Sequence, residues 1–152
     1  MVKHKSCSFF GHRKIEDNFS KDKLFSVIED TIKRGYDTFL FGGFGEFDDL
    51  CFEIVNRLKG KYEHIKTVYC LENERFLRAD KRPKYLTQKG YDEFVYFELD
   101  FNYWYTKIYY RNCEMIKNSD FIIFYALKKE NSGAYKALKY AHKLKKEYLN
   151  LC

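Results

Sequence analysis

The chain has 152 residues and a formal net charge of +6, with 28 basic and 22 acidic residues mixed along its length. That length predicts a single domain over residues 1–152, with room for a substantial hydrophobic core. A charged fraction of 33% and an aromatic fraction of 20% exclude a disordered, collagen-like or coiled-coil chain.

Strand-like apolar runs alternate with amphipathic helical stripes along the chain. We predict strands at residues 6–10, 38–41, 66–71, 93–97 and 121–125, and a short last strand at 148–151. Helices are predicted at residues 20–34, from about 47 to 58, at 103–118 and at 134–145. Ser20 is a suitable N-cap for the first helix, and Gly35 is suited to end it. Residues 72–92 are polar and are expected to form a long irregular loop.

This alternation is typical of an α/β protein. We predict a Rossmann-like three-layer fold, with a mainly parallel sheet of about five strands and helices on both faces. In such folds ligands bind at the carboxyl ends of the strands, near the point where the strand order reverses. The loops that follow strands are therefore the candidate sites.

The first of these loops is Gly11-His12-Arg13, directly after the first strand. Glycine lets a ligand approach the backbone closely, and the guanidinium of Arg13 suits a phosphate or carboxylate. His12 either titrates or holds the loop by a hydrogen bond. An ordinary turn with a solvated basic pair is the competing interpretation.

The second loop is rich in glycine and joins the second strand to a helix. Its candidate ligand residues are Gly42, Gly43, Gly45, Glu46, Phe47 and Asp48. Glycines before a helix suit an anion, but the spacing matches neither a Walker A loop nor the dinucleotide fingerprint. The acids Glu46, Asp48 and Asp49 repel a phosphate and are suited to accept hydrogen bonds from ribose or a base. Simple helix capping by Asp48 is the alternative.

Two further elements complete the candidate site. Ser132, Gly133 and Ala134 open the last long helix and permit a phosphate to approach, although an ordinary N-cap explains them equally well. Arg111 and Asn112 lie on the helix before the fifth strand, where Arg111 is placed to reach over the strand ends. A structural hydrogen bond for Asn112 and a surface position for Arg111 form the competing interpretation.

The cysteines and the apolar runs limit which cellular compartment and which cofactors we expect. The five cysteines are widely spaced and form neither a C-x-x-C pair nor a metal spacing with histidine. We therefore expect a reduced, cytoplasmic protein with no metal and no cofactor. Apolar runs such as residues 121–127 are too short to span a membrane, and no signal-peptide pattern opens the chain.

Aromatic residues crowd into residues 94–110, where nine of seventeen positions, Trp104 among them, are Phe, Tyr or Trp. Codon bias towards AT explains a general excess of Phe and Tyr, so composition alone does not establish a stacking surface. We expect this segment to fill the core, to wall a pocket or to form the interface of a homodimer or higher homo-oligomer. The basic residues of the 72–92 loop are consistent with a phosphate-seeking lid or with a solvated loop.

The order of these motifs resembles the SLOG superfamily, which includes Lonely Guy-like and DprA-like Rossmann-fold nucleotide-binding proteins, and in particular its small bacterial and phage members. The likeness rests on CSFFGHR at residues 7–13, GGFGEFDD at 42–49, RNCEMIKNSDFIIFY at 111–125 and the Ser132-Gly133-Ala134 turn. It covers most of the chain except residues 72–100. It implies one nucleotide-binding domain, over residues 1–152, with the ligand across the strand ends.

The resemblance also bears on catalysis. In Lonely Guy phosphoribohydrolases an arginine on the helix before a strand works with a glutamate in a downstream glycine-rich motif. Arg111 matches that arginine, but Ala137 stands where the glutamate would be. The likeness therefore implies binding rather than hydrolysis of the Lonely Guy type.

Two functions stay open. The first is binding of a nucleotide-derived small molecule, ADP-ribose-like or cyclic, for sensing or sequestration; a phage sponge against host nucleotide signalling fits that role. The alternative is a nucleoside-monophosphate N-glycoside hydrolase, with Glu46, Asp48, Asp49 and Arg111 as catalytic candidates. We expect no nucleic-acid partner, because acids crowd the glycine-rich loop and no block of like charges forms a nucleic-acid tail.

Overall fold

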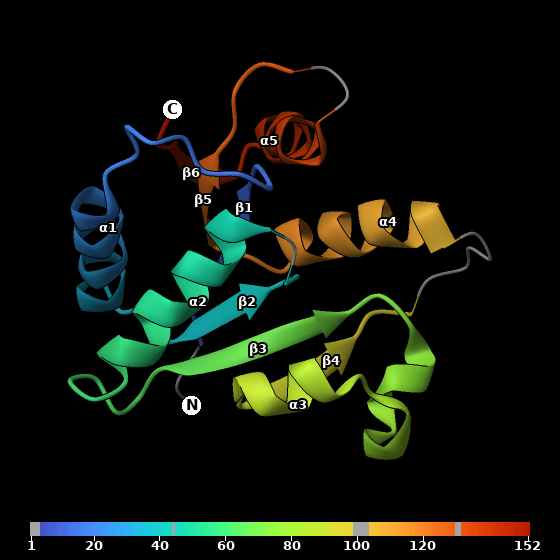
Figure 1. Cartoon of the computed structure of the whole chain (residues 1–152). Coiled ribbons are helices and arrows are strands. Elements are labelled where there is room, and N and C mark those ends of the chain that lie inside the picture. Colours follow the sequence, from blue (N-terminus) through green and yellow to red (C-terminus); the bar gives the residue numbers. More distant parts are fainter. Residues whose placement is uncertain (1–3, 44, 99–103, 130–131) are drawn as a thin grey trace.

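The computed structural model describes residues 4–43, 45–98, 104–129 and 132–152. Its strands are β1 (Ser6–Gly11), β2 (Thr38–Phe41), β3 (Lys66–Leu71), β4 (Glu93–Tyr96), β5 (Phe121–Tyr125) and β6 (Glu147–Asn150). Its helices are α1 (Lys21–Lys33), α2 (Glu46–Leu58), α3 (Lys84–Lys89), α4 (Trp104–Lys117) and α5 (Gly133–Lys143), with two short 3₁₀ helices at Glu74–Leu77 and Ala79–Lys81. Figure 1 shows how these elements are arranged around one sheet.

The six strands form one sheet in the order β4-β3-β2-β1-β5-β6, and every neighbouring pair is parallel. Cys7 of β1 lies beside Phe39 of β2 and Phe121 of β5, which fixes the register at the centre. The chain builds outward from β1 to β4 and then crosses to β5, on the other side of β1. The predicted α/β three-layer fold is confirmed, with six strands rather than about five.

Helices α1, α2 and α3 cover one face of the sheet. The hydroxyl of Ser20 accepts a hydrogen bond from the backbone N–H of Lys23 and caps α1, as its position before the helix predicts. The apolar stripe of α1, including the fully buried Leu24, belongs to the same core as β-strand side chains such as Phe9 and Phe41. Phe9 and Phe41 stack with their ring centroids 5.1 Å apart. This core fixes α2, and with it the glycine-rich loop, against the sheet.

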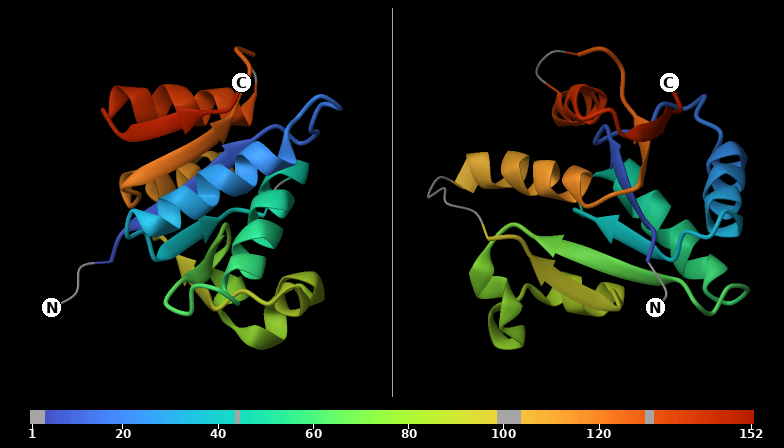
Figure 2. Two further views of the ribbon diagram at one scale, coloured as in Figure 1. Left: turned by 90° about the vertical axis from the view of Figure 1, so that its left-hand side faces the viewer. Right: turned by 180° about the vertical axis from the view of Figure 1, so that it is seen from behind.

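Helices α4 and α5 cover the opposite face, as the view from behind in Figure 2 also shows. Met115 and Ile116 of α4 are fully buried there with Phe124 of β5. Helix α5 contributes Ala137 and Ala141, whose small side chains let it lie close to the sheet. The two faces of the sheet therefore have separate hydrophobic cores. The carboxyl ends of the strands lie between the two helix layers, where a ligand site is expected.

Residues 72–92 are not one irregular loop, which corrects the prediction. They hold the two 3₁₀ helices and α3, and Leu86 anchors α3 in the first core at 1% exposure. Gly90 ends α3 with φ 90°, a left-handed conformation that favours glycine. A six-residue helix shows only one buried apolar position, which is too little for a periodic pattern to reveal.

The aromatic segment 94–110 is divided between different environments. Phe94 packs against the first core and Phe97 against the second, so part of the crowding fills the interior. Tyr109 and Tyr110 are exposed on α4. Residues 99–103 and the side chain of Trp104 lie outside the described part of the chain.

All five cysteines are free thiols, and four of them are buried. Within the described ranges, no group of three or more His, Cys, Asp or Glu side chains is placed to hold a metal ion. No helix in the part of the chain described above combines the length and apolar character needed to cross a membrane.

Candidate functional site

A cavity of about 240 Å³ opens at the carboxyl ends of β1 and β2. It lies beside the point where the strand order reverses, since α1 follows β1 on one face of the sheet and α5 follows β5 on the other. All four predicted elements contribute to it. Its lining residues are Phe9, Phe10, Gly11, Arg13, Gly42, Asp48, Ile108, Arg111, Asn112, Gly133 and Ala134.

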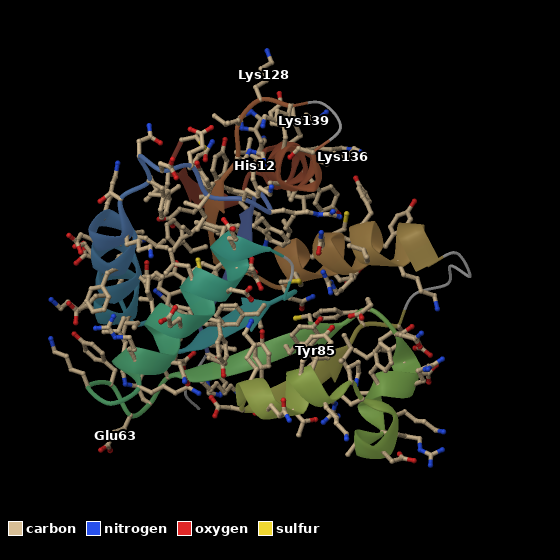
Figure 3. The ribbon with its side chains drawn as sticks, viewed as in Figure 1. His12, Glu63, Tyr85, Lys128, Lys136 and Lys139 are labelled. Atoms are coloured by element: carbon tan, nitrogen blue, oxygen red, sulfur yellow. The ribbon has the colours of Figure 1, made fainter. Side chains whose placement is uncertain are left out.

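The loop after β1 is held in place by His12 (Figure 3). The backbone N–H of Leu127 donates to Nε2 of His12 at 2.6 Å, so this nitrogen carries no proton, and Nδ1 lies 3.3 Å from the hydroxyl of Ser132. Burial, and secondarily the positive charge of Lys129, lower the pKa of His12. A neutral His12 thus ties the β1 loop to the segments before α5, outside the cavity lining. Arg13, the next residue, is exposed at the rim of the cavity.

Two of the predicted glycines serve close packing between the β1 loop and α2. A methyl group on Gly11 would lie 2.3 Å from the ring of Phe47, the buried aromatic in the first turn of α2. Gly45 has φ 97°, and a methyl group there would lie 2.7 Å from Cα of Arg13. The N–H of Glu46 then donates to the carbonyl oxygen of Arg13 at 2.8 Å. The first two candidate loops are therefore one interlocked unit.

The glycine-rich loop already bonds an anionic group of its own chain. The backbone N–H of Gly43 donates to the carboxylate of Asp48 at 2.6 Å. Asp48 is only 4% exposed, and this burial raises its pKa to about 7. The Gly43 bond and the positive charges of Lys89 and Arg111 oppose the rise. A phosphate therefore meets an occupied N–H at Gly43.

The other two predicted carboxylates face away from the cavity. Glu46 accepts a hydrogen bond of 2.7 Å from the backbone N–H of Ile15. Asp49 forms an ion pair with Lys89 of α3. Of the three acids that we considered for catalysis, Asp48 is the one that lines the cavity.

Arg111 lies over the strand ends and is bonded to them. Arg111 is 2% exposed, and its Nη1 donates to the carbonyl oxygens of Gly42 and Cys70, each at 3.2 Å. Nη2 donates to the side-chain oxygen of Asn112 at 3.1 Å, and the Glu72 carboxylate lies 3.5 Å from Nη1. Arg111 therefore fixes α4 to the ends of β2 and β3, and forms a wall of the cavity.

The N-terminus of α5 forms the side of the cavity best suited to an anion. Ser132 caps the helix by accepting the N–H of Tyr135 at 3.1 Å. No acid occurs in the first turn of α5, whereas the first turn of α2 carries three. Helix N-termini attract anions, and Gly133 and Ala134 line the cavity there. Arg13, Gly133 and Ala134 thus line the same cavity.

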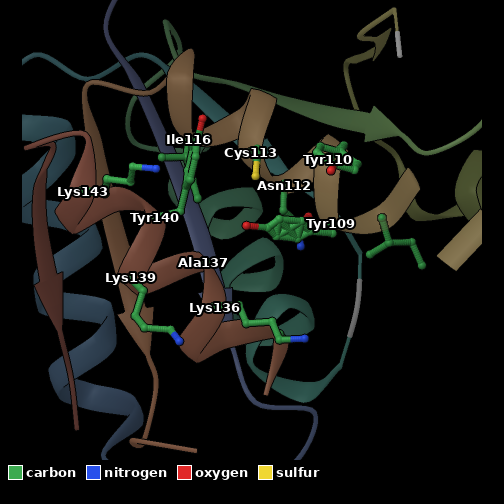
Figure 4. A pocket seen from close by; sticks show the side chains of 12 residues that line it. Tyr109, Tyr110, Asn112, Cys113, Ile116, Lys136, Ala137, Lys139, Tyr140 and Lys143 are labelled. Atoms are coloured by element: carbon green, nitrogen blue, oxygen red, sulfur yellow. The ribbon is translucent and has the colours of Figure 1, made fainter. Parts of the chain in front are cut away.

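A larger groove of about 790 Å³ adjoins this cavity between α4 and α5 (Figure 4). Tyr109 and Tyr110 line it, and they come from the aromatic segment expected to fill the core, wall a pocket or form an interface. The lysines of the groove are not among the predicted site residues. The two spaces share Ile108, Asn112 and Gly133. The sequence does contain a pattern that indicates this groove. Lys136, Lys139 and Lys143 recur at intervals of three and four residues on the side of α5 that bears no apolar stripe. The other lining residues are Tyr109, Tyr110, Cys113, Ile116, Lys136, Ala137, Lys139, Tyr140 and Lys143.

Comparison with known proteins finds similarity at the level of structure. No family model matches the sequence, and no curated protein matches it either. DNA processing protein A from Helicobacter pylori, described for its single-stranded DNA binding mode, superposes with a TM-score of 0.65 at 17% identity. DprA from Streptococcus pneumoniae gives a TM-score of 0.67 at 14% identity. Each match covers 95% of this chain, but only 63% and 49% of those two chains.

These neighbours correct one expectation. The exclusion of nucleic acid as a partner is wrong, because the fold is shared with a protein that is described as binding single-stranded DNA. The acids on which that exclusion rested are bonded within the protein at Glu46 and Asp49, and Asp48 is buried with a raised pKa. The chain therefore shares the Rossmann-like fold of the two DprA structures, which is the fold that the order of its sequence motifs predicted.

Proposed function

We propose that the protein binds single-stranded DNA and holds one backbone phosphate in the cavity at the carboxyl end of β1. One observation carries this proposal: exposed Arg13 and the acid-free first turn of α5 lie on the same cavity. A guanidinium and a helix N-terminus together match the charge and the hydrogen-bonding needs of a phosphate.

Two further observations support the proposal. The structural neighbour from Helicobacter pylori is described as a single-stranded DNA binder, and most of this chain superposes on it. The cavity is about 240 Å³, smaller than the usual pocket for a whole small ligand, and it continues into the α4–α5 groove. A phosphate with part of its sugar fits such a space, and the rest of a strand can leave it.

A small nucleotide-derived ligand, ADP-ribose-like or cyclic, is the second candidate. Asp48 favours it, because a buried carboxyl group with a pKa of about 7 lines the cavity and suits a ribose hydroxyl. Binding alone would serve sensing or sequestration, including a phage counter-defence role. If the ligand were hydrolysed, Asp48 would be the acid–base group, with Arg111 fixing the wall beside it.

Fluorescence anisotropy with a labelled twelve-nucleotide oligothymidylate tests the proposal. Gly133→Asp places a carboxylate at the first turn of α5, where an added side chain meets open space and an acid is favourable to the helix. We expect this variant to bind the oligonucleotide on the order of tenfold more weakly, and Gly133→Ala to bind like the wild type.

The same titration separates the two candidates. Competition with AMP, cyclic AMP and ADP-ribose should leave the oligonucleotide bound, whereas unlabelled oligothymidylate should displace it. The proposal fails if the oligonucleotide does not bind, or if Gly133→Asp and Gly133→Ala bind it equally well. Displacement by a small nucleotide at a lower concentration than by the strand establishes the second candidate instead. Release of free base from nucleoside monophosphates, absent in Asp48→Asn, would add hydrolysis to it.

A further inference from the structure

The groove between α4 and α5 is continuous with the proposed phosphate site but is made of different chemistry. Lys136, Lys139 and Lys143 stand on its α5 side, and all three are exposed. Figure 4 shows them on the helix that faces Tyr109 of α4. None of the acidic residues in the described ranges lines the groove. The charged side chains among its lining residues are therefore three lysines.

The spacing of these lysines matches a polyanion. Residues 136, 139 and 143 extend along about 10 Å of helix axis, since each residue of an α-helix rises 1.5 Å. At the rise of about 3.4 Å per phosphate of a strand stacked as in B-form DNA, that length carries about three phosphates. The floor between the lysines and α4 is apolar, with Ala137 and Ile116 buried.

The opposite wall offers aromatic rings. Tyr109 is 40% exposed and Tyr110 is 36% exposed, and the two rings meet edge to face with centroids 5.2 Å apart. Tyr140 lines the groove from α5. Exposed aromatic side chains beside a row of lysines form the combination that binds single strands, because bases stack on the rings while lysines neutralise phosphates.

Other occupants fit this surface less well. A second copy of the chain, related by a two-fold axis, would bring the same three lysines into contact with their equivalents and repel. An acidic peptide would satisfy the lysines but has no bases for the tyrosines. The charge and the rings together favour a nucleic-acid strand.

We infer that the α4–α5 groove binds the nucleotides that adjoin the phosphate held at Arg13 and Gly133, so that a strand runs from the β1 cavity along α5. This inference rests on the proposed function. It adds a path for the strand along α5, with lysines on one side of the groove and tyrosines on the other, and it sets a minimum length for a strand that fills the groove. A trinucleotide reaches only the cavity, and a twelve-nucleotide strand also fills the groove.

The test compares a trinucleotide and a twelve-nucleotide oligothymidylate on three proteins. The groove variant carries Lys136→Gln, Lys139→Gln and Lys143→Gln. The control variant has the same net charge but carries Lys21→Gln, Lys23→Gln and Lys33→Gln on α1, which packs on the other face of the sheet. All six lysines are exposed, so the variants should fold.

We expect the groove variant to bind the twelve-nucleotide strand at least about tenfold more weakly and the trinucleotide unchanged. The slope of log affinity against log salt should fall by about 2, the value for three lost phosphate contacts on a single strand. The control variant should keep the wild-type slope. Tyr109→Ala should weaken the long strand about fivefold or more without changing the slope, since stacking is not electrostatic.

The possible failures can be told apart. If wild type binds both strands and the groove variant matches it on the longer one, the groove inference is overturned and the proposed function stands. If wild type binds neither strand, the proposed function fails and the inference with it. An acidic polypeptide that displaces the long strand equally from wild type and Tyr109→Ala would assign the groove to a protein partner.

Discussion

The carboxylate of Asp48 accepts the backbone N–H of Gly43 at 2.6 Å, within the loop whose glycines predict an anion site. The anionic group that this loop binds is therefore a carboxylate of the same protein. Under the proposed function, a phosphate would instead meet Arg13 and the first turn of α5, which line the same cavity.

Replacing Asp48 should change how stability depends on pH. Burial raises the folded-state pKa of Asp48 from 3.8 to about 7, so its contribution to stability is full below pH 3.8 and is lost as pH rises through 7. Asp48→Asn keeps an oxygen for the Gly43 N–H but cannot ionise. Its stability relative to wild type should be higher at pH 8 than at pH 5 by about 2–3 kcal/mol. Urea unfolding at the two pH values measures this, and equal differences at both would contradict it.

Gly11 should tolerate no side chain. Gly11→Ala would place a methyl group 2.3 Å from the ring of Phe47, and should lower the free energy of unfolding by about 1–3 kcal/mol. Gly133→Ala has open space and should change it by less than about 0.5 kcal/mol. Thermal or urea unfolding of the two variants provides the comparison. A Gly11→Ala protein as stable as Gly133→Ala would show that α2 does not pack on the β1 loop as described.

Arg111 should be structural as well as part of the cavity wall. Arg111→Lys keeps the charge but cannot donate to Gly42, Cys70 and Asn112 together, which leaves buried acceptors unsatisfied. We expect a loss of about 2–4 kcal/mol in the free energy of unfolding.

The matched control for that variant is Arg78→Lys, whose guanidinium pairs with Asp80 at the surface. It should change stability by less than about 1 kcal/mol. Equal stability of the two variants would refute the buried hydrogen-bond network around Arg111.

His12 should make the β1 loop sensitive to acid. Its pKa is lowered from 6.5, so the stability that its neutral form contributes is present above pH 6.5 and is lost as pH falls through the lower folded-state value. His12→Gln offers an amide oxygen that accepts the Leu127 N–H at any pH. Between pH 7 and pH 5 the melting temperature of wild type should fall relative to this variant. His64→Gln, at an exposed position, should track wild type instead.

Much of the fold was predictable because its elements carry complete local signals. Buried strands such as β5 read as continuous apolar runs, and α1 has both a capping serine and an apolar stripe. Helix α3 was missed because a single buried leucine, Leu86, anchors it. The bounds of β4 and β6 differ by a residue at one or both ends from those predicted, since edge strands are half exposed and lack the apolar contrast of central strands.

The candidate site was predictable in its location but not in its bonding. Parallel strands bring their carboxyl ends to one edge, so the loops at Gly11, Gly42 and Gly133 had to converge. The sequence does not reveal that Asp48 accepts a hydrogen bond from Gly43, or that Arg111 donates hydrogen bonds to backbone carbonyls. Those partners are set by distances across the sheet. Such choices depend on tertiary packing, which no local pattern encodes.

The most direct measurement of the central claim is an amide ¹⁵N–¹H NMR titration with a six-nucleotide oligothymidylate. If the strand places a phosphate in the cavity, the largest shifts should fall on the N–H groups of Gly11, Gly133 and Ala134, and Gly133→Asp should abolish them. No shift on addition of the strand, or shifts confined to the α1–α2 face, would contradict the account.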